Sequence, residues 1–364
     1  MRDVWKLPLA ELTARADEAA RAIHGDTVTY VVNRNANFTR VCQVGCAFCG
    51  FGRRPGTTGA TADTIDQVVA RVAKTPWVTE VCLQGGIDPS LPPAYYFDLV
   101  RALRAAFPDI HLHAFSPMEI DSLCEKSGQE PEEMVVRLRA AGVGSIPGTA
   151  AEILVNRVRR KISRNKLPAE RWIRIIRAAH LAGLRSSATI LFGHEETWDD
   201  IRAHFEVLRR IQGETGGFTE LVPLAFVPYE NRLGKILARR HGGMARLEER
   251  IRRRARRLYP LARLGLGDLI PNLQTSWVKL GLEGAGKSLS WGCNDFGGTL
   301  YEEAITRSSG GRHGERLAPE AIEAAIREAG RIPQRRTTLY DIVKNPFSLG
   351  KKSCQPSPEG HFAL

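Results

Sequence analysis

The feature that most constrains this 364-residue chain is a repeated alternation of short apolar runs with longer amphipathic stretches. Short apolar runs fit buried strands, and apolar residues three or four positions apart fit helices with one buried face. Strands that alternate with helices form a mostly parallel sheet with helices packed outside it. The sequence therefore predicts an α/β fold, and seven or eight such units favour a (β/α) TIM-like barrel over an open sheet.

The expected elements follow from this alternation. Strands are expected at Tyr30–Asn35, Val78–Leu83, Ile110–Phe115, Val143–Ile146, Ser186–Phe192, Glu220–Phe226 and Ile270–Thr275, with an eighth near Cys293–Phe296. Helices are expected at Thr64–Ala73, Ala94–Ala106, Pro131–Ala141, Pro168–Ala182, Asp199–Gln212 and Met244–Leu258. Gly142 and Gly183 directly follow two of these helices, as is common at helix C-termini.

No change of composition marks a domain boundary. We expect a single barrel domain over residues 1–343, with a helical extension at about residues 1–27, and a loose polar tail at 344–364. The N-terminus lacks the apolar core of a signal peptide, and no apolar run is long enough to span a membrane. The sequence therefore predicts a cytoplasmic protein without a membrane partner.

The net charge is +12, from 52 Lys and Arg against 40 Asp and Glu. Such an excess suits anionic partners in general, including nucleic acid. The densest basic segment, Arg246–Arg257, has the register of an amphipathic helix and lacks the interleaved aromatic or glycine residues of a nucleic-acid surface. We interpret it as a solvated helix face and expect no nucleic-acid partner.

Three cysteines, Cys42, Cys46 and Cys49, lie within eight positions in a Cys-x3-Cys-x2-Cys pattern. In a reducing compartment, such crowding indicates metal binding rather than disulfides. Thiolates suit iron–sulfur clusters, zinc and copper(I), and three of them leave one iron of a cubane without a protein ligand. A zinc site with a distant fourth ligand is the alternative, although the other cysteines are isolated and form no second pair.

The cysteine pattern, with Phe48 just before its last cysteine and a strand before the loop, resembles the radical S-adenosylmethionine (SAM) superfamily. The resemblance implies a [4Fe-4S] cluster on the three cysteines, with SAM bound to the fourth iron through its amino and carboxylate groups. It also implies that reduction of the cluster cleaves SAM, and that the resulting 5′-deoxyadenosyl radical abstracts hydrogen from a substrate.

Further segments narrow the resemblance to the 4-hydroxyphenyl transferase subunits of FO synthase, which act in deazaflavin (coenzyme F-420) biosynthesis. They are 31–39, 82–86, 111–119, 147–154, 272–279 and 294–300. The resemblance implies two small-molecule substrates, L-tyrosine and 5-amino-6-(D-ribitylamino)uracil, together with a reducing electron donor. It also implies a partner, a second radical SAM subunit that closes the deazaflavin ring.

Two alternatives stay open at this point. The first keeps the cofactors and changes the substrate, to one of the futalosine menaquinone route or to another aromatic substrate of a divergent paralogue. It stays open because Pro228–Lys235 differs from the expected family form at a place where a barrel binds substrate. The second, more remote, is a basic RNA-binding protein with a structural metal site. Iron content and reductive formation of 5′-deoxyadenosine distinguish the two classes.

Candidate cofactor-binding residues follow the early strands. Gly85 and Gly86, after Gln84, would let the backbone approach the SAM amino group, unless they simply form a turn. Phe48 would contact the cofactor or pack in the core. Glu119 and Glu152 would accept hydrogen bonds from SAM, or lie in the first turn of a helix.

Candidate substrate-binding and catalytic residues lie at later strand ends, where barrel enzymes hold their active sites. His113 would face the barrel interior near the substrate, although a core histidine is the common alternative. Amide, hydroxyl and carboxyl groups can form hydrogen bonds with a diaminouracil, a ribityl chain or the tyrosine amino group. The alternative is that they form ordinary hydrogen bonds at the strand ends. Such groups occur at Gln274, Thr275, Asn294 and Asp295. His194 and Glu119 are the candidate catalytic residues.

Overall fold

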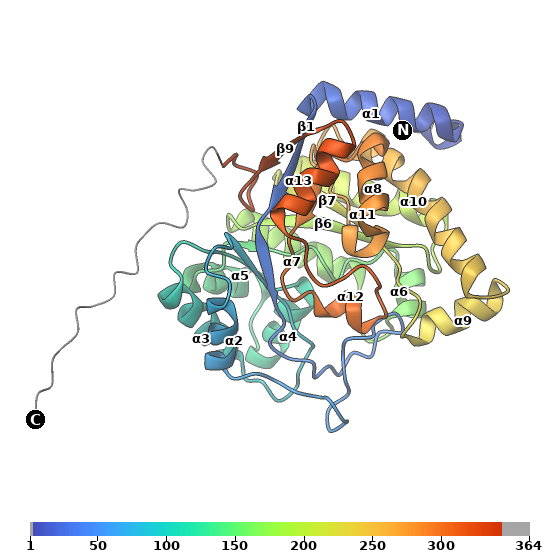
Figure 1. Ribbon diagram of the computed structural model, residues 1–364. Helices are drawn as coiled ribbons and strands as arrows, with labels where there is room; N and C mark the ends of the chain where they lie inside the picture. The colour runs from blue at the N-terminus through green and yellow to red at the C-terminus, as the bar shows by residue number, and fades with distance from the viewer. Residues whose placement is uncertain (1–2, 344–364) are drawn as a thin grey trace, which may run out of the picture.

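The computed structural model describes residues 3–343, in which parallel strands are surrounded by helices (Figure 1). Six strands form one parallel sheet in chain order: β2 (Asn33–Ala36), β3 (Glu80–Leu83), β4 (His111–Ala114), β5 (Ser145–Ile146), β6 (Arg185–Phe192) and β7 (Phe218–Ala225). A second sheet places β1 (Thr27–Val31) between β8 (Asp295–Gly298) and β9 (Ile332–Arg335).

The two sheets join into a ring. β1 continues into β2 through Val32 alone, so the two are halves of one bent strand. On the other side, parallel bridges pair Leu221 of β7 with Leu273, and Gln274 with Asp295 of β8. The strand order therefore closes on itself, and the predicted (β/α) TIM-like barrel is confirmed.

Helices cover the outside of this ring. They are α2 (Ile65–Ala73), α3 (Pro93–Ala106), α4 (Pro117–Ser127), α5 (Pro131–Ala141), α6 (Asn156–Ile162), α7 (Ala169–Leu181), α8 (Trp198–Thr215), α9 (Arg232–Arg240), α10 (Met244–Leu266), α11 (Trp277–Ser288), α12 (Ala304–Ser308) and α13 (Pro319–Glu328). Thr64, Ser116 and Thr197 begin three of them with capping boxes, which satisfy backbone N–H groups at the helix start.

Three of the differences between the structure and the sequence prediction concern strands. The strand expected at Ile270–Thr275 is reduced to two bridges, because the Asn294 side chain accepts the Leu273 N–H at 2.8 Å in place of a neighbouring strand. The first strand is interrupted at Val32, and its register against β8 shifts between Thr29 and Val31. Strand β9 was not predicted, since its sequence Ile-Pro-Gln-Arg has little apolar character.

The N-terminal extension contains η1 (Asp3–Lys6) and α1 (Leu9–His24), and α1 packs against α10. Leu12, Ala16 and Ala20 form its buried face. The expected division into one barrel domain and a tail stays a prediction, because 344–364 lie outside the described residues.

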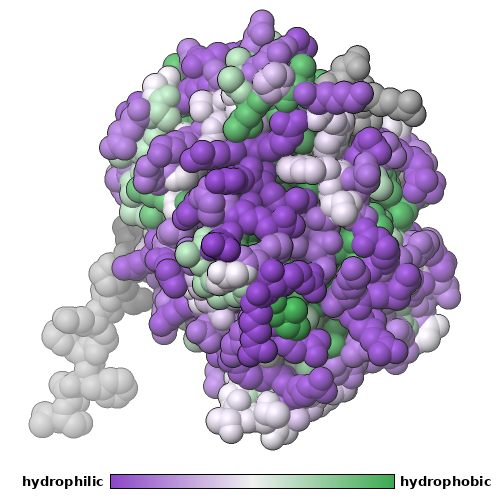
Figure 2. All heavy atoms as spheres, turned by 90° about the vertical axis from the view of Figure 1, so that its right-hand side faces the viewer, coloured by the Kyte–Doolittle hydropathy of each residue, from purple (hydrophilic) through white to green (hydrophobic). Residues whose placement is uncertain are grey.

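The face of the molecule that carries α9 and α10 is mainly hydrophilic (Figure 2). This agrees with the interpretation of Arg246–Arg257 as a helix with one solvated face, since Leu247, Ile251 and Leu258 on its other face are buried. Among the described residues, no helix has the length and apolar character that crossing a membrane requires.

The amino ends of the strands are closed by the segment that follows β9. Arg336, which is 1% exposed, lies between the buried Asp295 and the mostly buried Glu220: its Nε is 2.5 Å from Asp295, and its Nη2 is 3.4 Å from Glu220. The Tyr340 hydroxyl donates to Glu220, and the Tyr340 ring stacks on the Arg336 guanidinium at 3.9 Å. A buried cation is thus paired with two carboxyl groups at the barrel floor, and the polar groups of this end are used within the fold.

We predict that Arg336→Met lowers the free energy of unfolding by about 3–5 kcal/mol, because it leaves Asp295 and Glu220 buried without their counter-ion. Urea unfolding followed by circular dichroism measures this change. Arg327→Met is the matched control. It removes an exposed ion pair with Glu323 and should change stability by less than about 1 kcal/mol. Equal urea midpoints for the two variants would contradict the interpretation that Arg336 is the counter-ion of Asp295 and Glu220.

Candidate active site

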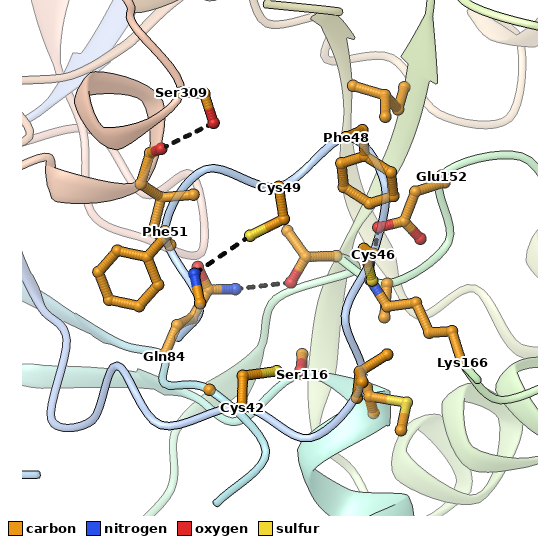
Figure 3. Close-up of a pocket in the computed structure, with 18 of the residues that line it drawn as sticks. Cys42, Cys46, Phe48, Cys49, Phe51, Gln84, Ser116, Glu152, Lys166 and Ser309 are labelled. Atoms are coloured by element: carbon orange, nitrogen blue, oxygen red, sulfur yellow. Dashed lines mark hydrogen bonds and ion pairs between the residues drawn. The ribbon is translucent and has the colours of Figure 1, made fainter. Parts of the chain in front are cut away.

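A cavity of about 230 Å³ opens at the carboxyl ends of the strands (Figure 3). Its wall is mainly apolar, and a few polar groups converge on it. The polar and sulfur-bearing lining residues are Cys42, Cys46, Cys49, Gln84, Ser116, Met118, Glu119, Thr149, Glu152, Lys166, Thr189, Lys279 and Ser309. A mostly apolar pocket with convergent polar groups is the usual form of a small-molecule site.

The three cysteines lie on one loop after β2, and distant segments hold that loop in place. Its backbone makes hydrogen bonds of 2.7–3.1 Å: Cys42 N to Arg53 O, Gln43 N to Ile87 O, Ala47 N to Ile162 O, Leu233 N to Ala47 O, and Gly50 N to Ser309 Oγ. The loop conformation therefore depends on contacts with other segments of the barrel mouth.

The three thiols are free and line the pocket. Burial raises the pKa of Cys46 to about 12, and the Cys49 sulfur accepts the Gly52 N–H at 3.4 Å. No group of three His, Cys, Asp or Glu within residues 3–343 is arranged around a single metal ion. Three thiols presented from separate positions of one loop are the donor set of an iron–sulfur cluster, which binds them as thiolates and displaces their protons.

Gly85 and Gly86 pack directly beneath the cysteine loop. A Cβ on Gly86 would lie 2.1 Å from the Val41 carbonyl oxygen and 2.9 Å from the Cys42 Cβ. A Cβ on Gly85 would lie 2.8 Å from the Phe38 ring. The packing of the cysteine loop therefore requires glycine at both positions, independently of any contact that their backbones make with a ligand.

The Glu119 carboxylate is 1% exposed and already holds three hydrogen bonds. It accepts from Ser116 N at 2.8 Å and Ser116 Oγ at 2.6 Å, which caps α4, and from Gly85 N at 2.9 Å. Burial outweighs these bonds and raises the pKa of Glu119 to about 7. Glu119 therefore connects the start of α4 to the glycine turn at the pocket wall.

Glu152 presents a buried carboxylate oxygen to the same pocket. Its Oε1 accepts from Lys166 at 2.6 Å, while its Oε2 has no hydrogen-bond partner among the described residues. Its backbone is in the left-handed region, with φ of 42°, and Ala150 beside it has φ of 69°. Such strain is often stored at ligand sites. The buried Glu152 Oε2 accepts no hydrogen bond from the described residues, although it lies 3.9 Å from the Arg159 guanidinium, and it can accept one from a hydroxyl-bearing ligand.

Lys166 was not predicted from the sequence. Burial opposes its charge, but Glu152 and Cys46 outweigh that effect and raise the pKa of Lys166 above its ordinary value. Its Nζ also lies 5.4 Å from the centre of the Phe48 ring. Figure 3 shows Phe48, Glu152 and Lys166 together beside Cys46. The only hint in the sequence was that Lys166 lies in a polar loop just before Pro168. That loop does not indicate the ion pair between Lys166 and Glu152.

His194 and His113 do not line this pocket. His194 is 1% exposed, its Nδ1 accepts the Glu195 N–H at 2.7 Å, and its Nε2 lies 2.9 Å from Leu191 O. The His113 ring lies inside the barrel, 2.7 Å from Ser145 Oγ, and burial lowers its pKa to about 4. The roles expected for both histidines stay predictions.

The four polar residues expected to bind substrate at the later strand ends also lie away from the pocket lining. Gln274 donates to Asp295 and Glu220 at the barrel floor. Thr275 Oγ1 accepts from a serine of α11 at 2.7 Å, and Asn294 accepts from Arg263 at 2.6 Å. The structure gives all four a partner within the fold, so their binding roles also stay predictions.

We predict that Gly86→Ala displaces the cysteine loop and reduces the iron bound after anaerobic reconstitution to below half of the wild-type amount. The cause is the overlap of the new Cβ with the Val41 carbonyl. Gly213→Ala in α8 is the control, since a Cβ there would have no atom within 4 Å and alanine favours helix. Wild-type iron content in Gly86→Ala would show that the loop tolerates the displacement.

Comparison with known proteins identifies two family models along the chain. The radical SAM superfamily model matches residues 36–208, and the model described as the CofH/MqnC C-terminal region matches residues 215–349. Among solved structures, methylornithine synthase aligns with a TM-score of 0.66 at 15% identity, over 92% of this chain and 93% of that one. The FeFe-hydrogenase maturase HydG from Carboxydothermus hydrogenoformans aligns at 0.62 and 14%, over 91% and 73%. Both likenesses concern the fold alone.

Curated relatives are more similar in sequence. The chain is 46% identical to the FO synthase of Mycobacterium leprae over 92% of its length, but spans only 38% of that protein. It is 41% identical to the 5-amino-6-(D-ribitylamino)uracil–L-tyrosine 4-hydroxyphenyl transferase of Methanococcoides burtonii, over 92% of both chains. A transferase of the same name from Methanosarcina acetivorans is 42% identical over 93% of this chain and 88% of that one. The chain therefore belongs to the radical SAM family of 5-amino-6-(D-ribitylamino)uracil–L-tyrosine 4-hydroxyphenyl transferases.

Proposed function

We propose that this protein transfers the 4-hydroxybenzyl group of L-tyrosine to 5-amino-6-(D-ribitylamino)uracil. In this reaction the Cα–Cβ bond of tyrosine breaks, a glycine-derived imine leaves, and the benzylic carbon bonds to the uracil. The observation that carries the proposal is the set of three free thiols at the barrel mouth, in a chain that aligns with almost the whole length of transferases of that name.

The residues present fit a [4Fe-4S] cluster and SAM. Cys42, Cys46 and Cys49 would hold the cluster, and Glu152 Oε2, which accepts no hydrogen bond among the described residues, would accept one from a SAM hydroxyl. The Gly85 and Gly86 carbonyls, which accept no hydrogen bond from the described residues, would face the SAM amino group. When bound, the two groups supply reductive cleavage of SAM to a radical that abstracts hydrogen.

The protein's own contribution is binding and exclusion of water. Leu191, Leu224, Phe226 and Val227 line one side of the pocket and provide an apolar surface for an aromatic ring. Phe48, under the Lys166 ammonium, would cover the cofactor side. Glu119 and Gln84 would hold the glycine turn, because Glu119 accepts from Gly85 N and Gln84 donates to Thr149 at 2.6 Å.

The proposal also includes partners. An electron donor must supply the reducing electron, and a second radical SAM subunit would close the deazaflavin ring in the product. In support, the FO synthases that match this chain contain further sequence beyond the matched segment, which covers 38–39% of their length.

We assign a supporting role to the predicted site residues that do not line the pocket. Five of them would support it from the barrel interior: His113, Gln274, Thr275, Asn294 and Asp295. His194 would support the loop after β6.

The direct test incubates anaerobically reconstituted protein with SAM, dithionite, tyrosine and the ribitylaminouracil, and follows products by mass spectrometry. We expect a 4-hydroxybenzyl adduct of the uracil together with 5′-deoxyadenosine, both lost in Cys46→Ala. Formation of 5′-deoxyadenosine with tyrosine left intact would overturn the substrate assignment and direct the search to futalosine-type substrates. Zinc instead of iron would overturn the radical chemistry.

Glu152→Gln tests the proposed cofactor contact. Loss of the charged acceptor should raise the Kd for SAM about 10–100-fold, the usual value of a hydrogen bond to a charged group. Equilibrium dialysis with labelled SAM measures it under anaerobic conditions. Glu170→Gln, which alters an exposed carboxylate bonded to Asn156, is the control and should bind SAM as the wild type does. Equal SAM affinity in both variants would show that Glu152 does not bind SAM.

A further inference from the structure

Four residues that line the pocket are glutamates or lysines, and three of them already have an ion-pair or hydrogen-bond partner. Glu152 and Lys166 form an ion pair of 2.6 Å. Glu119 is held by three hydrogen bonds from Ser116 and Gly85. The fourth is Lys279, whose ammonium makes no hydrogen bond or ion pair within residues 3–343. Among these four residues, Lys279 is the uncompensated charge.

No carboxylate among the described residues lies within ion-pair distance of the Lys279 ammonium. Glu303 is the carboxylate with the largest electrostatic effect on Lys279. Its two oxygens accept hydrogen bonds from Thr306 N and Oγ1 at 2.9–3.0 Å and cap α12. Burial lowers the pKa of Lys279, and Glu303 and Cys49 only partly oppose this. The half-buried Lys279 ammonium therefore has its hydrogen-bonding capacity free at the pocket, where an anionic group can form a charge-assisted hydrogen bond with it.

The position of Lys279 in the ring separates it from the proposed cofactor residues. Gln84, Glu119 and Glu152 follow β3, β4 and β5, whereas Lys279 follows the bridge residues Leu273 and Gln274 and lies in the first turn of α11. Between the two groups lies the apolar wall built by β6 and β7. This half of the pocket therefore fits a ligand with an aromatic body and one anionic end.

We propose that Lys279 binds the α-carboxylate of the amino-acid substrate and holds its aromatic side chain against the wall formed by β6 and β7. The inference rests on the proposed function and extends it to one substrate. The ribitylaminouracil has no anionic group near neutral pH, so an anion site in this half distinguishes tyrosine from the acceptor. Lys279 is thus a binding residue for tyrosine, and its effect on the uracil is indirect.

The first experiment compares tyrosine with tyramine, which lacks only the carboxylate. In equilibrium dialysis with the reconstituted wild type and SAM, tyrosine should bind about 10–100-fold more tightly than tyramine, as a charge-assisted hydrogen bond requires. In Lys279→Met the two ligands should bind equally, and Lys279→Arg should restore most of the preference. A preference that persists in Lys279→Met would overturn the assignment.

The second experiment measures steady-state constants for each substrate in the same variants. The KM for tyrosine should rise about 10–100-fold in Lys279→Met, while those for the uracil and SAM stay within about twofold. Lys287→Met, which removes an exposed lysine of the same helix paired with Glu283, is the control. A selective rise in the KM for SAM or for the uracil would assign Lys279 to that ligand instead and overturn the proposal.

These outcomes separate the two proposals. If the wild type forms the adduct but Lys279→Met keeps normal tyrosine binding, only the role of Lys279 fails. A changed cluster reduction potential with unchanged tyrosine binding also overturns that role alone, because Lys279 would then act on the thiolate of Cys49. If the wild type forms no adduct and does not bind tyrosine, the proposed function fails, and the tyrosine site fails with it.

Discussion

The site depends on one geometric constraint: in a closed ring of parallel strands, all carboxyl ends meet at the same mouth. The ring here closes through bridges at Leu273 and Gln274, and β1 and β2 share one bent strand. Because of that closure, the cysteine loop after β2 lies beside loops that follow every other strand. Backbone hydrogen bonds from Ile87, Ile162 and Leu233 then hold the loop.

The two ends of the barrel use charge in opposite ways. At the floor, the Arg336 guanidinium is fully paired with Asp295 and Glu220, so this end is closed and its polar groups serve the fold. At the mouth, within the described residues, one Glu152 oxygen accepts no hydrogen bond and lies 3.9 Å from Arg159, and the Lys279 ammonium lines the pocket without a hydrogen bond or ion pair. A polar group without a partner inside a protein costs stability, and these two groups both line the pocket, where a ligand can complete them.

The sequence was sufficient for the barrel, the cysteine loop and the family, because each has a local signal: apolar periodicity, cysteine spacing and short motifs. It was insufficient where a residue acts through distant partners. Gln274, Asn294 and Asp295 have the chemistry of substrate ligands, but Arg336, Arg263 and Glu220 occupy their polar groups. Lys166 and Lys279 have no local signal of their position, since only the closed ring brings them to the pocket.

The central claim is that tyrosine is cleaved between Cα and Cβ at this mouth. Isotope tracing with tyrosine labelled at Cβ in one reaction and at Cα in another tests it most directly. The account predicts that the Cβ label appears in the uracil adduct and that the Cα label appears in glyoxylate, the hydrolysis product of the released imine. Recovery of both labels in one product, or in unchanged tyrosine while 5′-deoxyadenosine accumulates, would contradict it.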